Sequence, residues 1–220
     1  MFKVNIIFYF FILIFISLFF ISCKRTKTEY FSNGNKKYEV ELKGGKRNGF
    51  ENRWLESGNL QSQFEYKNDS LNGISKRWFF NGNIQSEDTY KNNKLNGLSV
   101  LWDLSGNKII EKTYRNDTLS GSYKEWHPNG QLKVEGTNKN GLFQGVWIYF
   151  DIFGVVVGKG SFRNGTGILK GYNQNGQLIK EVSYQHNQKN GEEKYYDSSG
   201  VLVNVVVYKN DRIIDSPQKK

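Results

Sequence analysis

One regularity limits what this chain can fold into more than any other: glycine recurs at a fixed period through most of its 220 residues. An aromatic residue stands four positions before each of these glycines, and a second glycine series, from Gly49 to Gly191, keeps the same period. A fixed period of about 20 to 50 residues is typical of arrays whose units bury apolar surface only by stacking on one another. Steps of 24 residues, with one step of 22, separate Gly34, Gly58, Gly82, Gly106, Gly130, Gly154, Gly176 and Gly200.

Each repeat has the pattern of a β-hairpin. In the repeat that begins at Gly49, the sequence predicts a strand over 50–55, a tight turn over 56–59, a returning strand over 60–66 and a longer loop over 67–72. The turn contains Gly58, which supplies the positive φ that tight turns need. We therefore predict an all-β fold, an elongated and curved single-sheet meander of repeated β-hairpins with a 24-residue period.

Alternation along the strands predicts two unlike faces. Side chains in a strand point to opposite sides in turn, so Phe50 and Trp54 are expected on one face and Arg53 on the other. If the returning strand starts directly opposite Trp54, Phe64 and Tyr66 join the tryptophan face. The sequence therefore predicts one apolar face, on the inner side of the curve, and one polar face.

The first residues resemble an export signal rather than part of the array. An almost wholly apolar run follows Lys3 and ends at Ser22 and Cys23, and Cys23 is the only cysteine in the chain. The segment from Phe20 to Cys23 resembles a bacterial lipobox, in which the cysteine becomes the first residue of the mature chain and carries the lipid, typically with palmitate. The alternative is an uncleaved membrane helix, because the run is just long enough to span a bilayer. Both interpretations tether the repeats to a membrane.

These boundaries predict four parts and a location. The protein is expected to be exported and membrane-anchored in the bacterial cell envelope, through lipid at Cys23. The predicted parts are a lipoprotein-type signal peptide over 1–22, a short tether over 23–29, the repeat array over 30–211 and a polar C-terminal tail over 212–220.

The repeat pattern resembles a known family. An aromatic residue, three residues, a glycine and a β-run that ends in Tyr-Lys-Asn and Leu-Asn-Gly stand at 54–73 and 78–97 and, slightly altered, at 102–121. This resembles the variant MORN repeat of the YwqK-like antitoxin family, over Tyr30 to about Asp211. The resemblance implies a MORN-like β-hairpin array that neutralises a toxin partner, while MORN-type repeats are otherwise associated with protein docking and with acidic lipids.

The longer loops begin with a basic residue in most repeats. Since these loops lie at the same end of every hairpin, a meander brings them to one rim, about 10 Å apart. Such a row of cations is suited to acidic lipid, polysaccharide or an acidic protein, and the alternative is that the residues are ordinary solvated loop positions. The members of this predicted basic rim are Lys67, Lys91, Arg115, Lys139 and Arg163.

The rhythm is least regular between Asn138 and Gly167. Here the strands become more apolar and the loop over 163–166 is two residues short, so we expect the rim to be pulled in and the ribbon to bend. We predict a partner-contact patch at Trp147, Tyr149 and Phe153, and the alternative is a packing adjustment between two runs of repeats.

No catalytic or cofactor-binding pattern stands out. The two histidines, His127 and His186, occupy different repeat positions, and one cysteine forms neither a disulfide nor a thiolate metal cluster. A column of glutamates is expected to form a solvated charge ladder, namely Glu87, Glu111, Glu135 and Glu181. We therefore expect no enzymatic activity, no cofactor, no metal site, no small-molecule substrate and no nucleic-acid partner.

The function predicted from these features is a non-enzymatic, membrane-tethered repeat protein that binds an unknown protein partner or serves as a scaffold in the bacterial envelope. Toxin neutralisation, as an antitoxin or immunity-type protein, is the first alternative. The second is binding of acidic lipid or polysaccharide through the basic rim, for which the formal charge of +10 is favourable.

Overall fold

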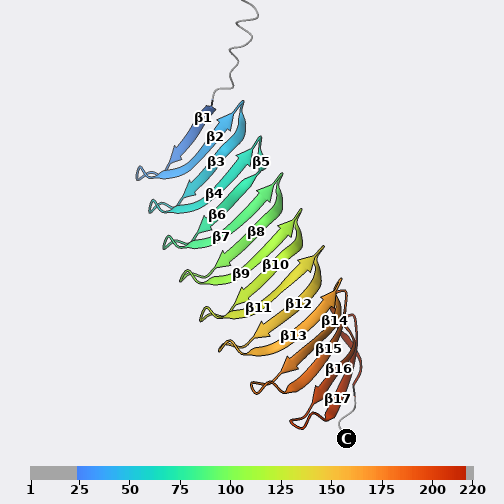
Figure 1. Cartoon of the computed structure of the whole chain (residues 1–220). Coiled ribbons are helices and arrows are strands. Elements are labelled where there is room, and N and C mark those ends of the chain that lie inside the picture. Colours follow the sequence, from blue (N-terminus) through green and yellow to red (C-terminus); the bar gives the residue numbers. More distant parts are fainter. Residues whose placement is uncertain (1–23, 217–220) are drawn as a thin grey trace, which may run out of the picture.

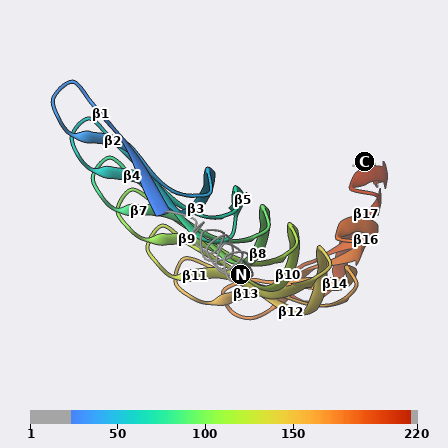
Figure 2. The same cartoon turned by 90° about the horizontal axis from the view of Figure 1, so that it is seen from above.

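The computed structural model describes residues 24–216, which form a single sheet of 18 strands. Strands that follow one another in sequence pair antiparallel, from β1 with β2 to β17 with β18, except that β5 and β6 both pair with β4. Figure 1 shows the strands stacked along one axis, and Figure 2, seen from above, shows that the sheet is curved. The predicted curved, single-sheet β-meander is confirmed.

Most strands have 7 to 9 residues, and β5, β6 and β18 are shorter. In chain order they are β1 (Lys24–Tyr30), β2 (Lys36–Lys43), β3 (Lys46–Trp54), β4 (Leu60–Lys67), β5 (Ser70–Leu71), β6 (Gly73–Trp78), β7 (Ile84–Lys91), β8 (Lys94–Trp102), β9 (Lys108–Arg115), β10 (Thr118–Trp126), β11 (Leu132–Lys139), β12 (Leu142–Phe150), β13 (Val156–Arg163), β14 (Thr166–Tyr172), β15 (Leu178–Gln185), β16 (Gln188–Tyr196), β17 (Leu202–Lys209) and β18 (Arg212–Asp215).

The sheet extends beyond the predicted array at both ends. Most of the predicted tether is β1, which pairs with β2 along its whole length, and the predicted polar tail begins as β18. A short polar segment can join a sheet when the neighbouring strand offers free backbone groups. The predicted signal peptide, Cys23 and residues 217–220 lie outside the described residues.

The short turns are three-residue hairpin loops. The Gly58 N–H donates to the Leu55 carbonyl at 2.9 Å, the Leu55 N–H donates to the Asn59 carbonyl at 2.9 Å, and Gly58 has φ of 90°. This is a type I turn closed by a glycine bulge, and the same pair of bonds recurs at every glycine of the first series. The predicted role of these glycines is confirmed.

The bulge changes which side chains share a face, and the predicted separation of faces is wrong. Trp54 pairs with Leu60 as expected, but the register then shifts so that Arg53 pairs with Ser62. Tyr66 therefore lies on the face of Arg53, because a one-residue shift moves every following side chain to the other side. Both faces carry mixed columns of apolar and polar residues.

The predicted longer loops are two-residue turns. Lys67 pairs with Ser70, and between them Asn68 and Asp69 have φ of 49° and 66°, the left-handed pair of a type I′ turn. The residues that follow the turn belong to the next strand, which then bulges around Gly73 at φ of 133° before regular pairing resumes. A predicted six-residue loop is thus a turn followed by a bulge.

The structure also corrects the prediction for the 22-residue step. The turn at Asn164 and Gly165, with φ of 50° and 74°, keeps two residues, and β13 pairs with β14 without any register shift. The two missing residues are therefore those of the bulge. The prediction of a shorter loop that pulls in the rim is wrong, since the turn is as long as the others.

Candidate binding surfaces on the two rims

The two kinds of turn line opposite edges of the stack, as Figure 1 shows. The five predicted basic-rim residues each close a type I′ turn, and all five side chains are exposed. Among residues 24–216, no ion pair of the structure involves any of the five. Their charges are consequently directed to solvent.

Hydrogen bonds between repeats hold the basic rim in place. The Asp69 N–H donates to the Arg47 carbonyl, and the Arg47 N–H donates to Asp69 Oδ1, both at 2.9 Å. The same reciprocal pair joins Asn93 with Leu71, and it recurs further along the rim. Each turn is therefore fixed to the turn before it, and the spacing of two strands, about 10 Å, does not depend on side-chain packing.

The chain enters the sheet on this rim. Lys24, the first residue of β1, pairs with Lys43, which begins the type I′ turn at Gly44 and Gly45. The position that follows Cys23 in sequence thus lies beside the first turn of the basic rim.

The opposite rim carries a feature that the sequence reasoning missed. Phe80 is 69% exposed, Leu104 44% and Ile152 46%, and each stands two positions before a glycine of the first series. Pro128 occupies the same repeat position and is exposed, and Phe153 beside Ile152 is 78% exposed. The sequence signal for this feature is an apolar residue two positions before four successive glycines of the first series. We refer to the apolar tips as Phe80, Leu104, Pro128, Ile152 and Phe153.

Side-chain amides fix the apolar tips. Asn81 and Asn83 both donate through Nδ2 to the Leu104 carbonyl, at 3.0 Å. Asn59 donates in the same way to the Phe80 carbonyl at 3.0 Å, and Asn129 to the Ile152 carbonyl at 2.8 Å. The backbone beneath these apolar side chains is consequently held before any partner arrives.

The predicted partner patch divides between core and surface. Trp147 is only 2% exposed and packs with Val134 and Phe162, with its ring 4.3 Å from that of Phe143. Its indole covers Gly136, where a Cβ would lie 2.2 Å from the ring, and the indole N–H donates to a backbone carbonyl at 3.1 Å. Trp147 as a surface contact is therefore wrong, and the alternative of a packing adjustment describes it.

The other two patch residues differ from one another. Tyr149 is half-buried against the same cluster, and burial raises its pKa to about 12, with Tyr184 and Glu125 adding to the shift. Phe153 is exposed and belongs to the apolar tips. Only this member of the predicted patch is directed to solvent.

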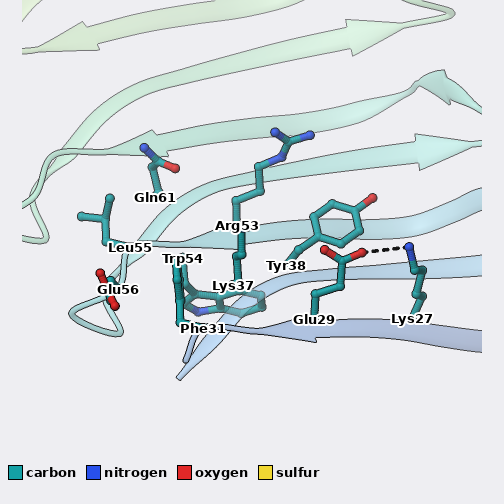
Figure 3. A pocket seen from close by; sticks show the side chains of 10 residues that line it. All are labelled: Lys27, Glu29, Phe31, Lys37, Tyr38, Arg53, Trp54, Leu55, Glu56 and Gln61. Atoms are coloured by element: carbon teal, nitrogen blue, oxygen red, sulfur yellow. Dashed lines mark ion pairs between the residues drawn. The ribbon is translucent and has the colours of Figure 1, made fainter. Parts of the chain in front are cut away.

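A hollow of about 690 Å³ lies near the N-terminal end of the sheet (Figure 3). Arg53 lies over the ring of Tyr38 at 5.6 Å, and Lys27 forms an ion pair with Glu29 at 2.8 Å. Arg53 also pairs with the buried Glu51 at 2.9 Å, so its charge is already compensated within the sheet. The lining residues are Lys27, Glu29, Phe31, Lys37, Tyr38, Arg53, Trp54, Leu55, Glu56 and Gln61.

Buried carboxylates occupy one repeat position near each end of the array. Glu193 is 1% exposed and accepts bonds from Lys189 at 2.7 Å and from the Tyr195 hydroxyl at 2.9 Å. Burial alone would raise the pKa of Glu193, but these bonds hold it below its ordinary value. Glu51 is 2% exposed and pairs with arginines. Each carboxylate is paired with cationic side chains of the same sheet, and we assign it a structural role.

The glutamates of the predicted charge ladder lie on the face of the sheet opposite to that of Glu51 and Glu193. Glu87 pairs with Lys76 at 2.9 Å and Glu181 with Lys170 at 3.2 Å, each on an adjacent strand, whereas Glu111 pairs with Lys108 at 2.8 Å on its own strand. Glu135 is in none of the ion pairs of residues 24–216. His127 Nε2 lies 3.0 Å from the Phe150 carbonyl, and His186 forms part of a type I′ turn. Within the described residues there is no group of three metal-ligating side chains, and none of the described segments is a helix long and apolar enough to cross a membrane.

An open β-sheet of similar hairpins, in which each repeat pairs its strands with those of the adjacent repeats, defines a linear repeat protein. The family model described as MORN repeat variant matches four segments, each running from one type I′ turn through a short turn to the next type I′ turn. The matched residues are 71–92, 119–140, 166–186 and 189–210. The chain therefore contains variant MORN repeats in these four segments. No match is found among curated proteins.

Proposed function

We propose that this chain is a non-enzymatic MORN-repeat module, tethered to a membrane of the bacterial envelope, which binds a protein partner through its apolar tips. MORN repeats are commonly protein- or membrane-binding modules. The observation that carries the proposal is the run of apolar side chains at one repeat position, Phe80, Leu104, Pro128 and Ile152, in four successive turns.

The apolar tips have the properties of a contact surface. Large exposed apolar side chains that gather on one edge mark interaction sites more often than singly scattered ones. The same position carries Glu56 before the run, and Gln174 and Ser198 after it, so the surface has polar limits on both sides. The side-chain amide bonds already order the turns, so these turns lose little conformational entropy when a partner binds.

The tether decides how this surface is presented. Lipid at Cys23 would lie beside the basic rim, because β1 starts there. The exposed cations of that rim then meet anionic headgroups, each contributing about 1 kcal/mol near the surface. The apolar tips lie at the far end of eight-residue strands, about 25 Å away, and face the partner. Under the YwqK-like resemblance, that partner is a toxin which the chain neutralises.

Site-specific photo-cross-linking in intact envelopes tests this function. A photoreactive amino acid replaces Leu104 in the full chain, and in a matched control it replaces Ser198, which is exposed at the same position of the last repeat. We expect one discrete protein adduct from position 104 and none from 198. The adduct should fall at least about tenfold when Phe80→Ser and Ile152→Ser are combined, because two anchors are lost.

The folded state of the double variant is checked by its thermal unfolding. Both side chains are largely exposed, so the melting temperature should stay close to that of the unmodified chain. Equal adducts from positions 104 and 198, or an adduct that survives in the double variant, would show that the apolar tips are not the partner surface.

A further inference from the structure

The C-terminal edge of the sheet is only half covered. On one side β17 pairs with β16 along its length, from Tyr208 to Leu202. On its other side β18 covers Val207, Tyr208 and Lys209, and within residues 24–216 no strand pairs there with residues 202–206. This uncovered stretch is rich in β-branched residues, and Val203 is 60% exposed. An unpaired apolar strand of this kind is a template for another strand.

The missing strand has a definite position in the repeat. Except in β14, the strand after a type I′ turn pairs in two parts separated by the bulge, as β3 shows, where Leu42 pairs with Arg47 and Val40 then pairs with Glu51. β18 supplies only the first part, in which Tyr208 pairs with Ile213. Pro217, two residues beyond the end of β18, has no N–H to donate to a ladder. Among residues 24–216, the second part is absent from this edge.

The N-terminal edge supplies that second part. β1 pairs with β2 on one side, and its other side has no partner strand among the described residues. Lys27 pairs with Val40, and Glu51 pairs with Phe64 at the equivalent position one repeat later, so Lys27 occupies the position of Glu51. By the same spacing Tyr30 occupies the position of Trp54. The first residue of β1 and the last residue of β18 thus have neighbouring positions in the repeat.

We propose that copies of this protein join head to tail, with β1 of one copy adding to the open side of β17 of another. The repeat register then places Val206 opposite Lys27, and Asn204 opposite Glu29, as Val40 lies opposite Glu51 and Tyr38 opposite Arg53 within the sheet. The same register places Val203 opposite Tyr30, and each of these side chains is 60% exposed in the single chain. The contact uses two different surfaces, so each added copy leaves one open edge at each end and the ribbon can lengthen.

The rims stay continuous across such a junction. Lys24 and Lys209 both lie on the side of the basic rim. Lys24 pairs with Lys43, which begins a type I′ turn, and Lys209 itself begins the last type I′ turn. The chain of each copy therefore enters the sheet on the same side. This inference does not depend on the apolar tips having a partner, because it concerns only the two strand edges.

Cysteine cross-linking between two populations of the full chain tests the junction. In a Cys23→Ser background and in detergent, chains with Val206→Cys are mixed with chains with Lys27→Cys under mild oxidation. We expect a disulfide-linked pair, because opposed residues of neighbouring strands bring their Cβ atoms within disulfide reach. Val182→Cys is the matched control, since Val182 has the same repeat position in β15 but is 2% exposed inside the sheet, and its yield with Lys27→Cys should be at least about tenfold lower.

A second variant blocks the edge without touching the cysteines. Val203→Lys places a charge on the exposed edge, so it should lower the Val206–Lys27 cross-link at least about fivefold and leave the unfolding temperature unchanged. Chains that cross-link only Val206 to Val206, or Val206 to a different protein, or that stay unlinked at about 100 μM, would each overturn head-to-tail joining.

Discussion

At the scale of the residue, this sheet buries charge only where the charge is fully compensated. Glu193 is one of the most buried side chains described, and the cations beside it, Lys189 at 2.7 Å and Lys180 at 3.3 Å, reach solvent themselves. The same repeat position carries Ser75 and Trp147 in other repeats. A single-layer sheet has no deep interior, so a carboxylate at this position is tolerated where long basic side chains cover it.

Glu193→Gln should therefore lower stability in a pH-dependent way. The substitution leaves the two lysines without their anion and should cost about 2 kcal/mol at neutral pH, less than for a deeply buried pair because the lysines reach water. Since the pKa of Glu193 in the folded chain lies below 4.5, its contribution is present above that pH and is lost as pH falls through the folded pKa. Thermal unfolding from neutral to acidic pH measures the difference between the two chains, which should shrink in acid.

The neighbouring Glu192→Gln is the control, because its side chain is 52% exposed and pairs only with Lys194 at the surface. It should change the free energy of unfolding by less than about 0.5 kcal/mol. A difference for Glu193→Gln that stays constant into acid would contradict the assignment of the stabilisation to the ionised carboxylate.

At the scale of the element, the sequence predicted which segments are strands better than it predicted their faces. The glycine period located every short turn, because glycine is needed there for a positive φ. The bulge that accompanies Gly58 has no sequence signal beyond that glycine. It nevertheless determines that Tyr66 shares a face with Arg53. The type I′ turns were missed for a related reason, since Asn68 and Asp69 adopt positive φ without glycine.

The basic rim could be predicted from the sequence, whereas the buried position of Trp147 could not. A rim follows from hairpin topology and loop composition alone. The burial of Trp147 depends on Gly136 in the neighbouring strand, which offers the space that its indole fills, and such cross-strand contacts require the register.

Asn187 is predicted to hold the sheet together at the 22-residue step. Its side chain accepts from the Phe143 N–H at 2.8 Å and donates to the Gly141 carbonyl at 2.9 Å, two repeats away, across the side-chain-free Gly165. Asn187→Gly keeps the φ of 67° accessible and removes both bonds, so we expect a loss of about 1–2 kcal/mol. Amide hydrogen exchange should show faster exchange at Phe143.

Asn140→Gly tests the same chemistry at a neighbouring turn, where φ is 52° and the residue is exposed. It should change neither the stability nor the Phe143 amide by a measurable amount. Unchanged protection of Phe143 in Asn187→Gly would contradict a role for Asn187 in joining the two sides of the step.

At the scale of the whole molecule, the two rims divide the protein's surface. The sheet is one layer thick, so its stability comes from contacts between neighbouring repeats and its edges stay available for binding. The basic rim lies where the chain enters, and the apolar tips lie at the other ends of the strands. The proposed tether at Cys23 and the cations of the rim would therefore act on the same side, and we expect them together to orient the sheet on an anionic surface.

This orientation predicts which rim approaches the lipid headgroups. The full chain, reconstituted into vesicles that contain phosphatidylglycerol, carries a fluorophore on a cysteine that replaces either Asn92 on the basic rim or Ser105 in a short turn. Headgroup-bound quenchers should quench the label at position 92 several-fold more than the label at 105. About 0.5 M salt, or Lys67→Glu combined with Arg115→Glu, should remove the difference, because both weaken the attraction between rim and lipid. Equal quenching at the two positions, or a difference that persists in vesicles of phosphatidylcholine alone, would show that the rim charges do not orient the protein.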